Sequence, residues 1–161
     1  MPMRIRPIVI AAAVLLLLAT ASFAKSPRDS MVVNTAWLAA HLEDPNLVLL
    51  HVGDPDEYKA RHIAGARFVT LSDIAVSDRS ATGLILEMPP TSEDLRGRLA
   101  KLGISDDSRI VVYYGNDWVS PTTRVIFTLD YAGLGERAVM LDGGMGAWVR
   151  EGHEVTDVVP A

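Results

Sequence analysis

The segment VVYYGNDWVSPTTR, residues 111–124, joins the end of an apolar run to a polar, glycine-containing loop and the start of a second apolar run. A strand, a loop and a helix in this order point backbone N–H groups and the positive end of the helix dipole at whatever lies above the loop. Such a site favours an anion or an anionic nucleophile. Yet the whole chain of 161 residues contains no cysteine, which excludes disulfides, thiolate metal sites and cysteine nucleophiles.

The candidate ligand-binding residues lie in this loop and at the start of the helix that follows it. They are Tyr114, Gly115, Asn116, Asp117, Trp118, Ser120, Thr123 and Arg124. The hydroxyl groups of this set, and that of Thr122, need a base within reach to act as nucleophiles, and no histidine is adjacent in sequence. We therefore expect these hydroxyls to form loop hydrogen bonds or to cap the helix, and a hydroxyl-based hydrolase is the least favoured function.

Three other side chains of the loop have competing interpretations. Asp117 would repel an anion, which argues against a strong oxyanion site. Trp118 is either an exposed contact residue or a lid over the core. Arg124 either faces an anion or pairs with an internal carboxylate, and we favour pairing because buried arginines are normally paired. The four histidines have no metal-ligand spacing, so we predict no metal and no cofactor.

The N-terminal residues have the layout of a secretory signal peptide. Arg4 and Arg6 precede the apolar run Ile8–Leu18, and small residues lead up to Ala24. The alternative is a membrane anchor, but about 20 apolar residues are needed to span a bilayer and this run is shorter. We therefore predict a signal peptide over residues 1–24, export to the periplasm or the cell exterior, and no membrane association after its removal.

Cleavage after residue 24 would leave 137 residues, enough for one domain with a substantial core. Loss of two arginines would change the net charge from −5 to −7. An acidic chain without a cluster of Lys and Arg is not expected to bind nucleic acid. We predict a tether over residues 25–30, a domain over 31–156, and a tail or the start of a linker over 157–161.

Strand-length apolar runs alternate with helical patterns along this domain. Residues 47–52 and 109–114 are nearly continuous apolar runs, which is typical of strands covered on both faces of a parallel sheet. Residues 77–90 have no clear period and end in two prolines, so we expect an insertion loop there. The alternation predicts an α/β fold with a mainly parallel sheet. Further strands are expected before Asn34 and over 66–71 and 137–141, and helices from Asn34 or Thr35 to Asp44 and over 54–62, 91–103, 121–133 and 142–152.

Three segments, in order, resemble the rhodanese family. EYKARHIAGARFV, residues 57–69, is similar to a motif in which a Tyr precedes Gly-His-Ile-Pro-Gly-Ala, with Arg61 for the first Gly and Ala64 for the Pro. RIVVYY with its loop resembles the strand that carries the active-site loop. VMLDGGMGAWVREGHEV, residues 139–155, resembles the closing Leu-Asp-Gly-Gly and Trp motif. The resemblance implies a rhodanese-like α/β fold, a parallel sheet of about five strands flanked by helices.

The resemblance also implies which residues have been lost. Rhodaneses transfer a sulfane sulfur through a cysteine persulfide, and a helix N-terminus lowers the pKa of such a thiol. The corresponding position here is Tyr114, or Gly115 if the register shifts by one. His51 and Gly53 stand where the family usually has an Asp and an Arg. The long loop, with Arg124 ten residues on, resembles the first half of tandem sulfurtransferases, which lacks the cysteine.

The resemblance therefore implies a domain that is inactive alone, the first half of a tandem thiosulfate or mercaptopyruvate sulfurtransferase. Its expected partner is a second rhodanese domain or a small sulfur-containing anion. The alternative is a stand-alone module that binds a small anion or a protein through the loop. If a second domain packs here, we expect an apolar patch around Trp118, Val119 and residues 83–90. Otherwise these residues would complete the domain's own core.

Overall fold

The computed structural model of the protein describes residues 31–79, 85–116 and 118–160. The predicted signal peptide and tether, residues 1–30, lie outside them. Across the described ranges, no helix has the length and apolar character needed to cross a membrane. The elements are β1 Val32–Val33, α3 Thr35–His41, β2 Leu47–Val52, α4 Pro55–Ala60, β3 Arg67–Phe68, α5 Leu71–Ile74, β4 Val76–Arg79, β5 Ile85–Met88, α6 Ser92–Lys101, β6 Arg109–Tyr114, α7 Val119–Tyr131, the 3-10 turn η1 Gly135–Arg137, β7 Ala138–Leu141 and α8 Gly144–Arg150.

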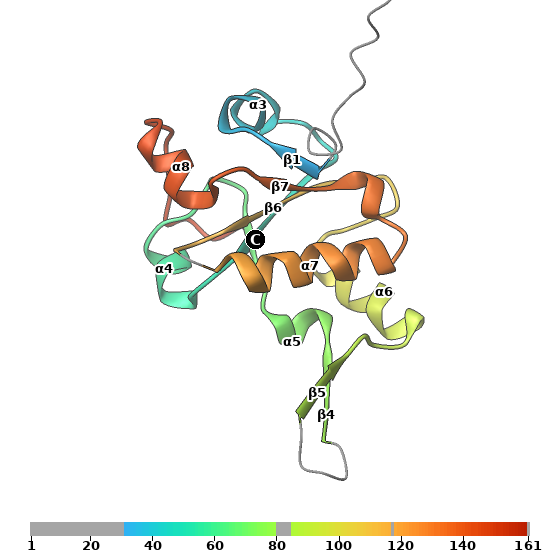
Figure 1. The fold of residues 1–161 in the computed structure, drawn as a ribbon. Coiled ribbons are helices and arrows are strands. Elements are labelled where there is room, and N and C mark those ends of the chain that lie inside the picture. Colours follow the sequence, from blue (N-terminus) through green and yellow to red (C-terminus); the bar gives the residue numbers. More distant parts are fainter. Residues whose placement is uncertain (1–30, 80–84, 117, 161) are drawn as a thin grey trace, which may run out of the picture.

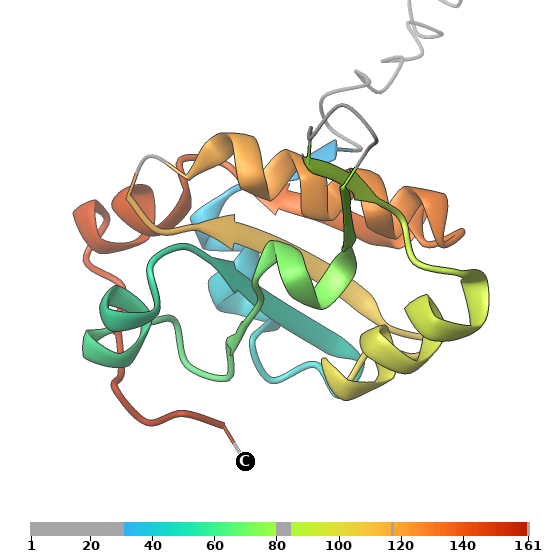
Figure 2. The same cartoon turned by 90° about the horizontal axis from the view of Figure 1, so that it is seen from below.

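The central sheet has five strands in the order β1-β7-β6-β2-β3, and every neighbouring pair is parallel (Figures 1 and 2). β2 and β6 lie in its middle and pair over six positions, from Leu47 opposite Arg109 to Val52 opposite Tyr114. The prediction of a parallel sheet of about five strands flanked by helices is confirmed.

Alternation along the two central strands builds a core on each face of the sheet. Leu50 and Val112 belong to a cluster with residues of α5, α6 and α7. Leu49 and Val111, one position earlier, belong to a second cluster with residues of α3 and α8. Because successive side chains of a strand point to opposite faces, a strand covered on both faces must be apolar at nearly every position. This is why the two continuous apolar runs form the central strands.

Side-chain caps begin two of the predicted helices. The cap of α3 is Asn34, whose side-chain oxygen accepts a hydrogen bond of 2.7 Å from the backbone N–H of Trp37. Thr91 caps α6 in the same way, with the N–H of Asp94 at 3.3 Å. Gly103, which follows α6, has a φ of +75°, the left-handed conformation in which helices commonly end. These helix boundaries agree with the sequence prediction.

The prediction of a loop over residues 77–90 is wrong. Val76–Arg79 and Ile85–Met88 pair as antiparallel strands in a separate two-stranded sheet, with Val76 opposite Met88 (Figure 1). Each strand has only four residues, too few for a reliable period, and the two are joined by backbone pairing. The strand expected over 66–71 is also shorter, because only Arg67 and Phe68 pair with β2.

The turn from β7 into α8 packs directly against the end of β6. Gly144 has a φ of +54°, and a Cβ atom placed on it would lie 2.8 Å from both the ring and the carbonyl oxygen of Tyr114. Only glycine tolerates this backbone conformation and this close approach together. The pair Gly143-Gly144 is therefore explained by tight packing between strand and helix, as the sequence suggested, rather than by a phosphate-binding turn.

Replacing Gly144 by alanine should destabilise the fold by about 2–3 kcal/mol, because left-handed backbone strain adds to the overlap with Tyr114. Gly146 is the matched control, since it is exposed within α8 and a Cβ there meets no atom within 4 Å. Gly146→Ala should be neutral or stabilising by up to about 1 kcal/mol. Urea unfolding of both variants measures the difference, and equal midpoints would contradict the packing argument.

Candidate functional site

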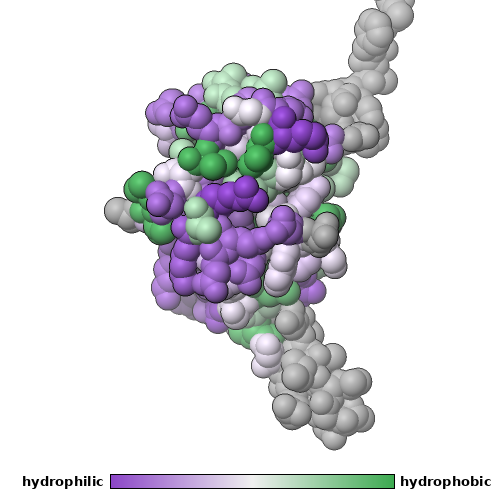
Figure 3. All heavy atoms as spheres, turned by 90° about the vertical axis from the view of Figure 1, so that its left-hand side faces the viewer, coloured by the Kyte–Doolittle hydropathy of each residue, from purple (hydrophilic) through white to green (hydrophobic). Residues whose placement is uncertain are grey.

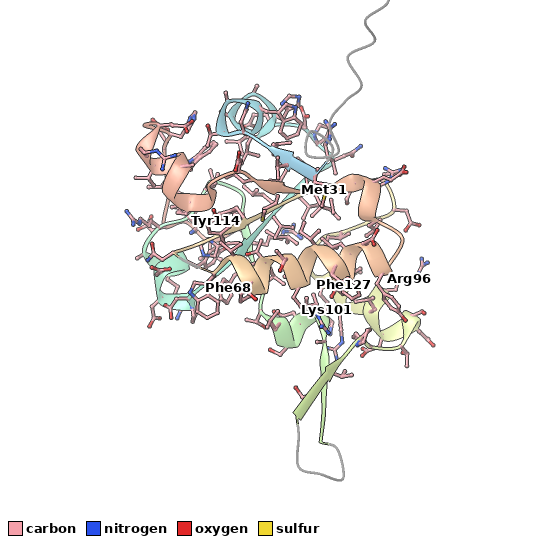
Figure 4. All side chains as sticks on the ribbon, viewed as in Figure 1. Met31, Phe68, Arg96, Lys101, Tyr114 and Phe127 are labelled. Carbon is pink, nitrogen blue, oxygen red and sulfur yellow. The ribbon has the colours of Figure 1, made fainter. Side chains whose placement is uncertain are left out.

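The predicted loop begins at the carboxyl end of β6, where the sheet brings it next to the segment that follows β2. The N–H of Gly115 donates a 2.9 Å hydrogen bond to the carbonyl of Val52, which extends the pairing of the two strands by one step. Tyr114 lies at the end of β6 beside α8 (Figure 4). Ligands of open α/β sheets bind outside the carboxyl ends of the strands, so the loop occupies the expected edge.

The short helix α4 brings a carboxylate to this loop. Asp54 caps the helix, because its side chain accepts from the N–H groups of Asp56 at 2.8 Å and Glu57 at 3.2 Å. Pro55 at the first position suits a helix start, since the N–H that proline lacks would have no intrahelical partner. Glu57 then extends to the loop, where its Oε1 accepts a hydrogen bond from the side-chain amide of Asn116.

His51 lies beneath the loop on β2 and is only 1% exposed. Three aromatic rings surround its imidazole, those of Tyr58, Phe68 and Tyr113, with ring centroids 4.8–6.0 Å away. Neither ring nitrogen has a hydrogen-bond partner within the described residues. An unpaired buried polar group lowers the stability of a fold by about 1–3 kcal/mol, so the burial of His51 is destabilising.

Two glycines make room for His51 at the edge of the sheet. A Cβ atom on Gly53 would lie 2.7 Å from the His51 Nε2 atom. A Cβ atom on Gly115 would lie 3.3 Å from that same Nε2 atom and 3.0 Å from the Oε2 atom of Glu57. The His51 ring and the Glu57 carboxylate thus fill the space that a side chain at position 115 would need.

Burial sets the charge of the groups beneath the loop. Desolvation, and to a lesser degree the nearby His62, lowers the pKa of His51 from 6.5 to about 4. The imidazole is therefore neutral near pH 7, with one donor and one acceptor nitrogen. Burial also raises the pKa of Tyr113, whose hydroxyl oxygen accepts a 3.1 Å hydrogen bond from the N–H of Ile63. Neither group adds positive charge that could attract an anion.

The hydroxyl groups at the start of α7 bond to the backbone. The side chain of Thr122 is fully buried and donates to the carbonyl of Trp118 at 2.8 Å. That of Thr123 donates to the carbonyl of Ser120 at 2.7 Å. These bonds agree with the structural role expected for the threonine hydroxyls. Burial and bonding leave Thr122 unsuited to act as a nucleophile.

The remaining predicted residues have different surroundings. Asn116 is exposed and bonded to Glu57, while Trp118 precedes α7 and is 42% exposed, which favours a contact residue over a lid. Arg124 lies one turn into α7 with its guanidinium 5.9 Å from the ring centroid of Phe127. Asp117 lies outside the described residues, and a ligand-binding role for these side chains stays a prediction.

The sequence analysis noted His51 and Gly53 only as departures from a family pattern, and it overlooked Glu57. The order of the elements could have indicated that these residues lie near the loop, because both central strands end at one edge of the sheet and a capped helix follows β2 directly. No group of three or more His, Asp or Glu side chains that could hold a metal occurs in the described part of the chain. The loop and α4 therefore offer the amide of Asn116 and the carboxylate of Glu57, and the chain supplies no thiol.

A known protein family matches most of the chain. Residues 34–151 match the protein family described as "Rhodanese-like domain". They include both central strands, the loop after β6 and the turn into α8.

The chain is also similar in sequence to curated thiosulfate sulfurtransferases. The chain is 33% identical over 133 residues to the thiosulfate sulfurtransferase of Azotobacter vinelandii, an alignment that covers 81% of this chain and 46% of that protein. It is 33% identical over 141 residues to the thiosulfate sulfurtransferase of Bos taurus, covering 78% and 45% respectively. The chain thus spans less than half the length of these relatives.

Solved structures share the fold. The crystal structure of YnjE superposes with a TM-score of 0.69 at 23% identity, covering 84% of this chain and 32% of that one. SseA from Escherichia coli, described as a 3-mercaptopyruvate sulfotransferase, gives 0.67 at 24% identity, covering 81% and 52%. At these identities the likeness establishes the fold alone.

The lowered pKa of His51 predicts that the protein loses stability in mild acid. Between pH 6.5 and about 4 the unfolded chain binds a proton at this residue and the folded chain does not, so the free energy of unfolding falls as pH falls. The full effect is about 3 kcal/mol, and above pH 6.5 it vanishes. Urea unfolding across this range should give a steeper pH dependence for the natural chain than for His51→Asn. Equal slopes would show that His51 is not held neutral.

Proposed function

We propose that this chain, which belongs to the rhodanese family, is an exported and catalytically inactive domain, the first half of a tandem thiosulfate or mercaptopyruvate sulfurtransferase. The observation that carries the proposal is the absence of any thiol in the chain, since the resemblance assigns the family's cysteine position to Tyr114, or to Gly115 if the register shifts by one. The match over residues 34–151 leaves the rest of the domain intact. A domain that keeps the fold and lacks the nucleophile would depend on a second domain to supply the thiol.

The sulfur-transfer step explains why a thiol is indispensable. A thiolate attacks the outer sulfur of thiosulfate, a sulfur–sulfur bond to the protein forms, and sulfite leaves with the electrons of the broken bond. The persulfide then passes its outer sulfur to a thiophilic acceptor. No oxygen nucleophile in the loop can form a persulfide. The carboxylate of Glu57, 3.0 Å from the Cβ position of residue 115, would moreover oppose a thiolate there.

The tandem arrangement is supported by the relatives and by the exposed start of α7. Relatives named thiosulfate sulfurtransferase are more than twice as long as the segment that this chain matches. Trp118 and Val119 are 42% and 41% exposed, which is consistent with a contact surface. Residues 83 and 84 of the predicted patch, and the side chains of residues 85–88, lie outside what the structure describes.

The same exposure also supports the second candidate, a stand-alone module that binds a protein. The side of the molecule with α4 and α8 is largely hydrophilic in Figure 3, and its hydrophobic areas are small and separate. A surface of this kind suits a polar or transient contact as well as one between domains, which commonly buries roughly 600–1,500 Å². The two candidates differ in whether the partner is part of the same chain.

We expect the purified protein to transfer no sulfur from thiosulfate to cyanide above the rate without protein. The reason is the absence of any thiol in the chain. Thiocyanate formation measures the reaction, and a preparation of an active rhodanese serves as the positive control. Turnover that persists after contaminating enzymes are removed would refute catalytic inactivity.

Sequencing the gene beyond codon 161 tests the tandem arrangement directly. The proposal expects the reading frame to continue into a second rhodanese domain whose loop carries a cysteine. A stop codon with no such domain would favour the stand-alone module instead.

Export predicts a mature N-terminus at Lys25. The protein, expressed in a bacterium with residues 1–24 in place, should appear in the periplasmic fraction and lack those residues by intact mass or N-terminal sequencing. A product that keeps Met1 and fractionates with membranes would instead make the run Ile8–Leu18 an anchor.

A further inference from the structure

A groove of about 550 Å³ lies between α6 and the C-terminal end of α7, at the opposite end of α7 from the candidate site. Both helices cover the same face of the sheet (Figure 1). The floor of the groove is apolar, because it consists of residues that belong to the core of this face or pack against it. They are Leu95 and Leu99 of α6, Ile104, and Leu134. The groove therefore reaches the hydrophobic core from outside.

Two exposed aromatic side chains lie at this groove. Tyr131, the last residue of α7, lines it, and Phe127 lies one helical turn earlier, so the two side chains share a face of the helix. Each residue is 56% exposed, more than any other Phe, Tyr or Trp in the described ranges. Single exposed apolar side chains are common on monomers, but an aromatic pair beside an apolar groove is typical of a surface that contacts another protein.

The rim of the groove carries charges of both signs. Arg96, labelled in Figure 4, and Glu93, one turn earlier on α6, are both exposed. Asp106, in the connection from α6 to β6, is exposed as well. None of the three takes part in an ion pair with another described residue. These charges are therefore available to a partner that brings the opposite sign.

We propose that this α6–α7 surface, meaning the groove together with Phe127, Tyr131 and the three charged residues of its rim, joins two copies of the protein about a two-fold axis. In a two-fold contact each copy presents the same patch, so one patch must contain both halves of every interaction. The α6–α7 surface meets this condition, because exposed aromatic side chains lie beside a groove with an apolar floor. The aromatic side chains of each copy fill the groove of the other, and each Arg96 faces carboxylates of the opposite copy.

A second copy fits these features better than a different partner does. A small molecule or an unrelated protein would require only one half of each interaction, either the groove or the aromatic pair. A rim of one sign would oppose association with its own copy, whereas this rim carries both signs. No residue of the α6–α7 surface belongs to the loop after β6, so the proposal is independent of the proposed function.

Sedimentation equilibrium of the purified protein over a range of concentrations tests the contact, and the natural protein should show a monomer–dimer equilibrium. Phe127→Ser removes an exposed ring and should raise the dissociation constant of the dimer at least about tenfold. Trp118→Ser is the matched control, because it removes another exposed aromatic side chain at the opposite end of α7 and should leave the constant unchanged. Circular dichroism checks that both variants keep the fold.

A charge exchange tests the pairing across the axis. Arg96→Glu leaves only carboxylates among the charged groups of the rim, and the double variant Glu93→Arg, Asp106→Arg leaves only guanidinium groups, so each should be monomeric alone. An equimolar mixture of the two should dimerise, because opposite charges then meet. A natural protein that stays monomeric at every concentration would overturn the proposal. So would dissociation caused by Trp118→Ser rather than by Phe127→Ser, or a mixture that dimerises no better than its components.

Discussion

The parallel pairing of β2 with β6 joins the two central strands over their whole length, from Leu47 opposite Arg109 to Val52 opposite Tyr114. Because parallel strands end at the same edge, this pairing places whatever follows Val52 beside whatever follows Tyr114. The turn into α4 and the loop into α7 thereby become neighbours although some 60 residues separate them in the chain. The position of each group at the site depends on this register.

Side chains of the protein itself fill the edge of the sheet beneath the loop. An imidazole takes the volume between Gly53 and Gly115, and the glycines accommodate it because they have no side chains. The ring contacts aromatic neighbours and remains neutral, so the fold bears the cost of burying polar nitrogens without gaining a charge. The adjacent carboxylate of Glu57 brings negative charge to the loop, with its Oε2 atom 3.0 Å from the Cβ position of Gly115.

The sequence predicted the architecture well, because the central strands carry a signal that few other structures produce. Runs such as LVLLHV and RIVVYY are apolar at nearly every position and require cover on both faces, which a parallel sheet provides. Caps such as Asn34 use local hydrogen bonds and are readable from neighbouring residues. The hairpin of β4 and β5 was not predicted, because each of its strands has only four residues and the sequence of this segment has no clear hydrophobic period.

The candidate site was predictable only in part, for a related reason. The loop after β6 could be placed from the order of strand and helix alone. The contact of Glu57 with Asn116 depends instead on the register of β2 against β6, on the cap at Asp54 and on one side-chain conformation. Each of these is a tertiary fact, and no short stretch of sequence contains it. The environment of His51 likewise depends on rings contributed by three separate elements or loops.

The sheet order has a consequence for how the chain folds during synthesis. The edge strand β1 pairs with β7, so Val32 lies opposite Met140, 108 positions later. Pairing such distant segments requires the closure of a long loop, which has a cost in conformational entropy. Proteins dominated by such pairings fold slowly. The N-terminal strand of the domain cannot take its place until β7, residues 138–141, has been made. For a protein proposed to leave the cytoplasm, such a delay would keep the nascent chain open while it still has to be translocated.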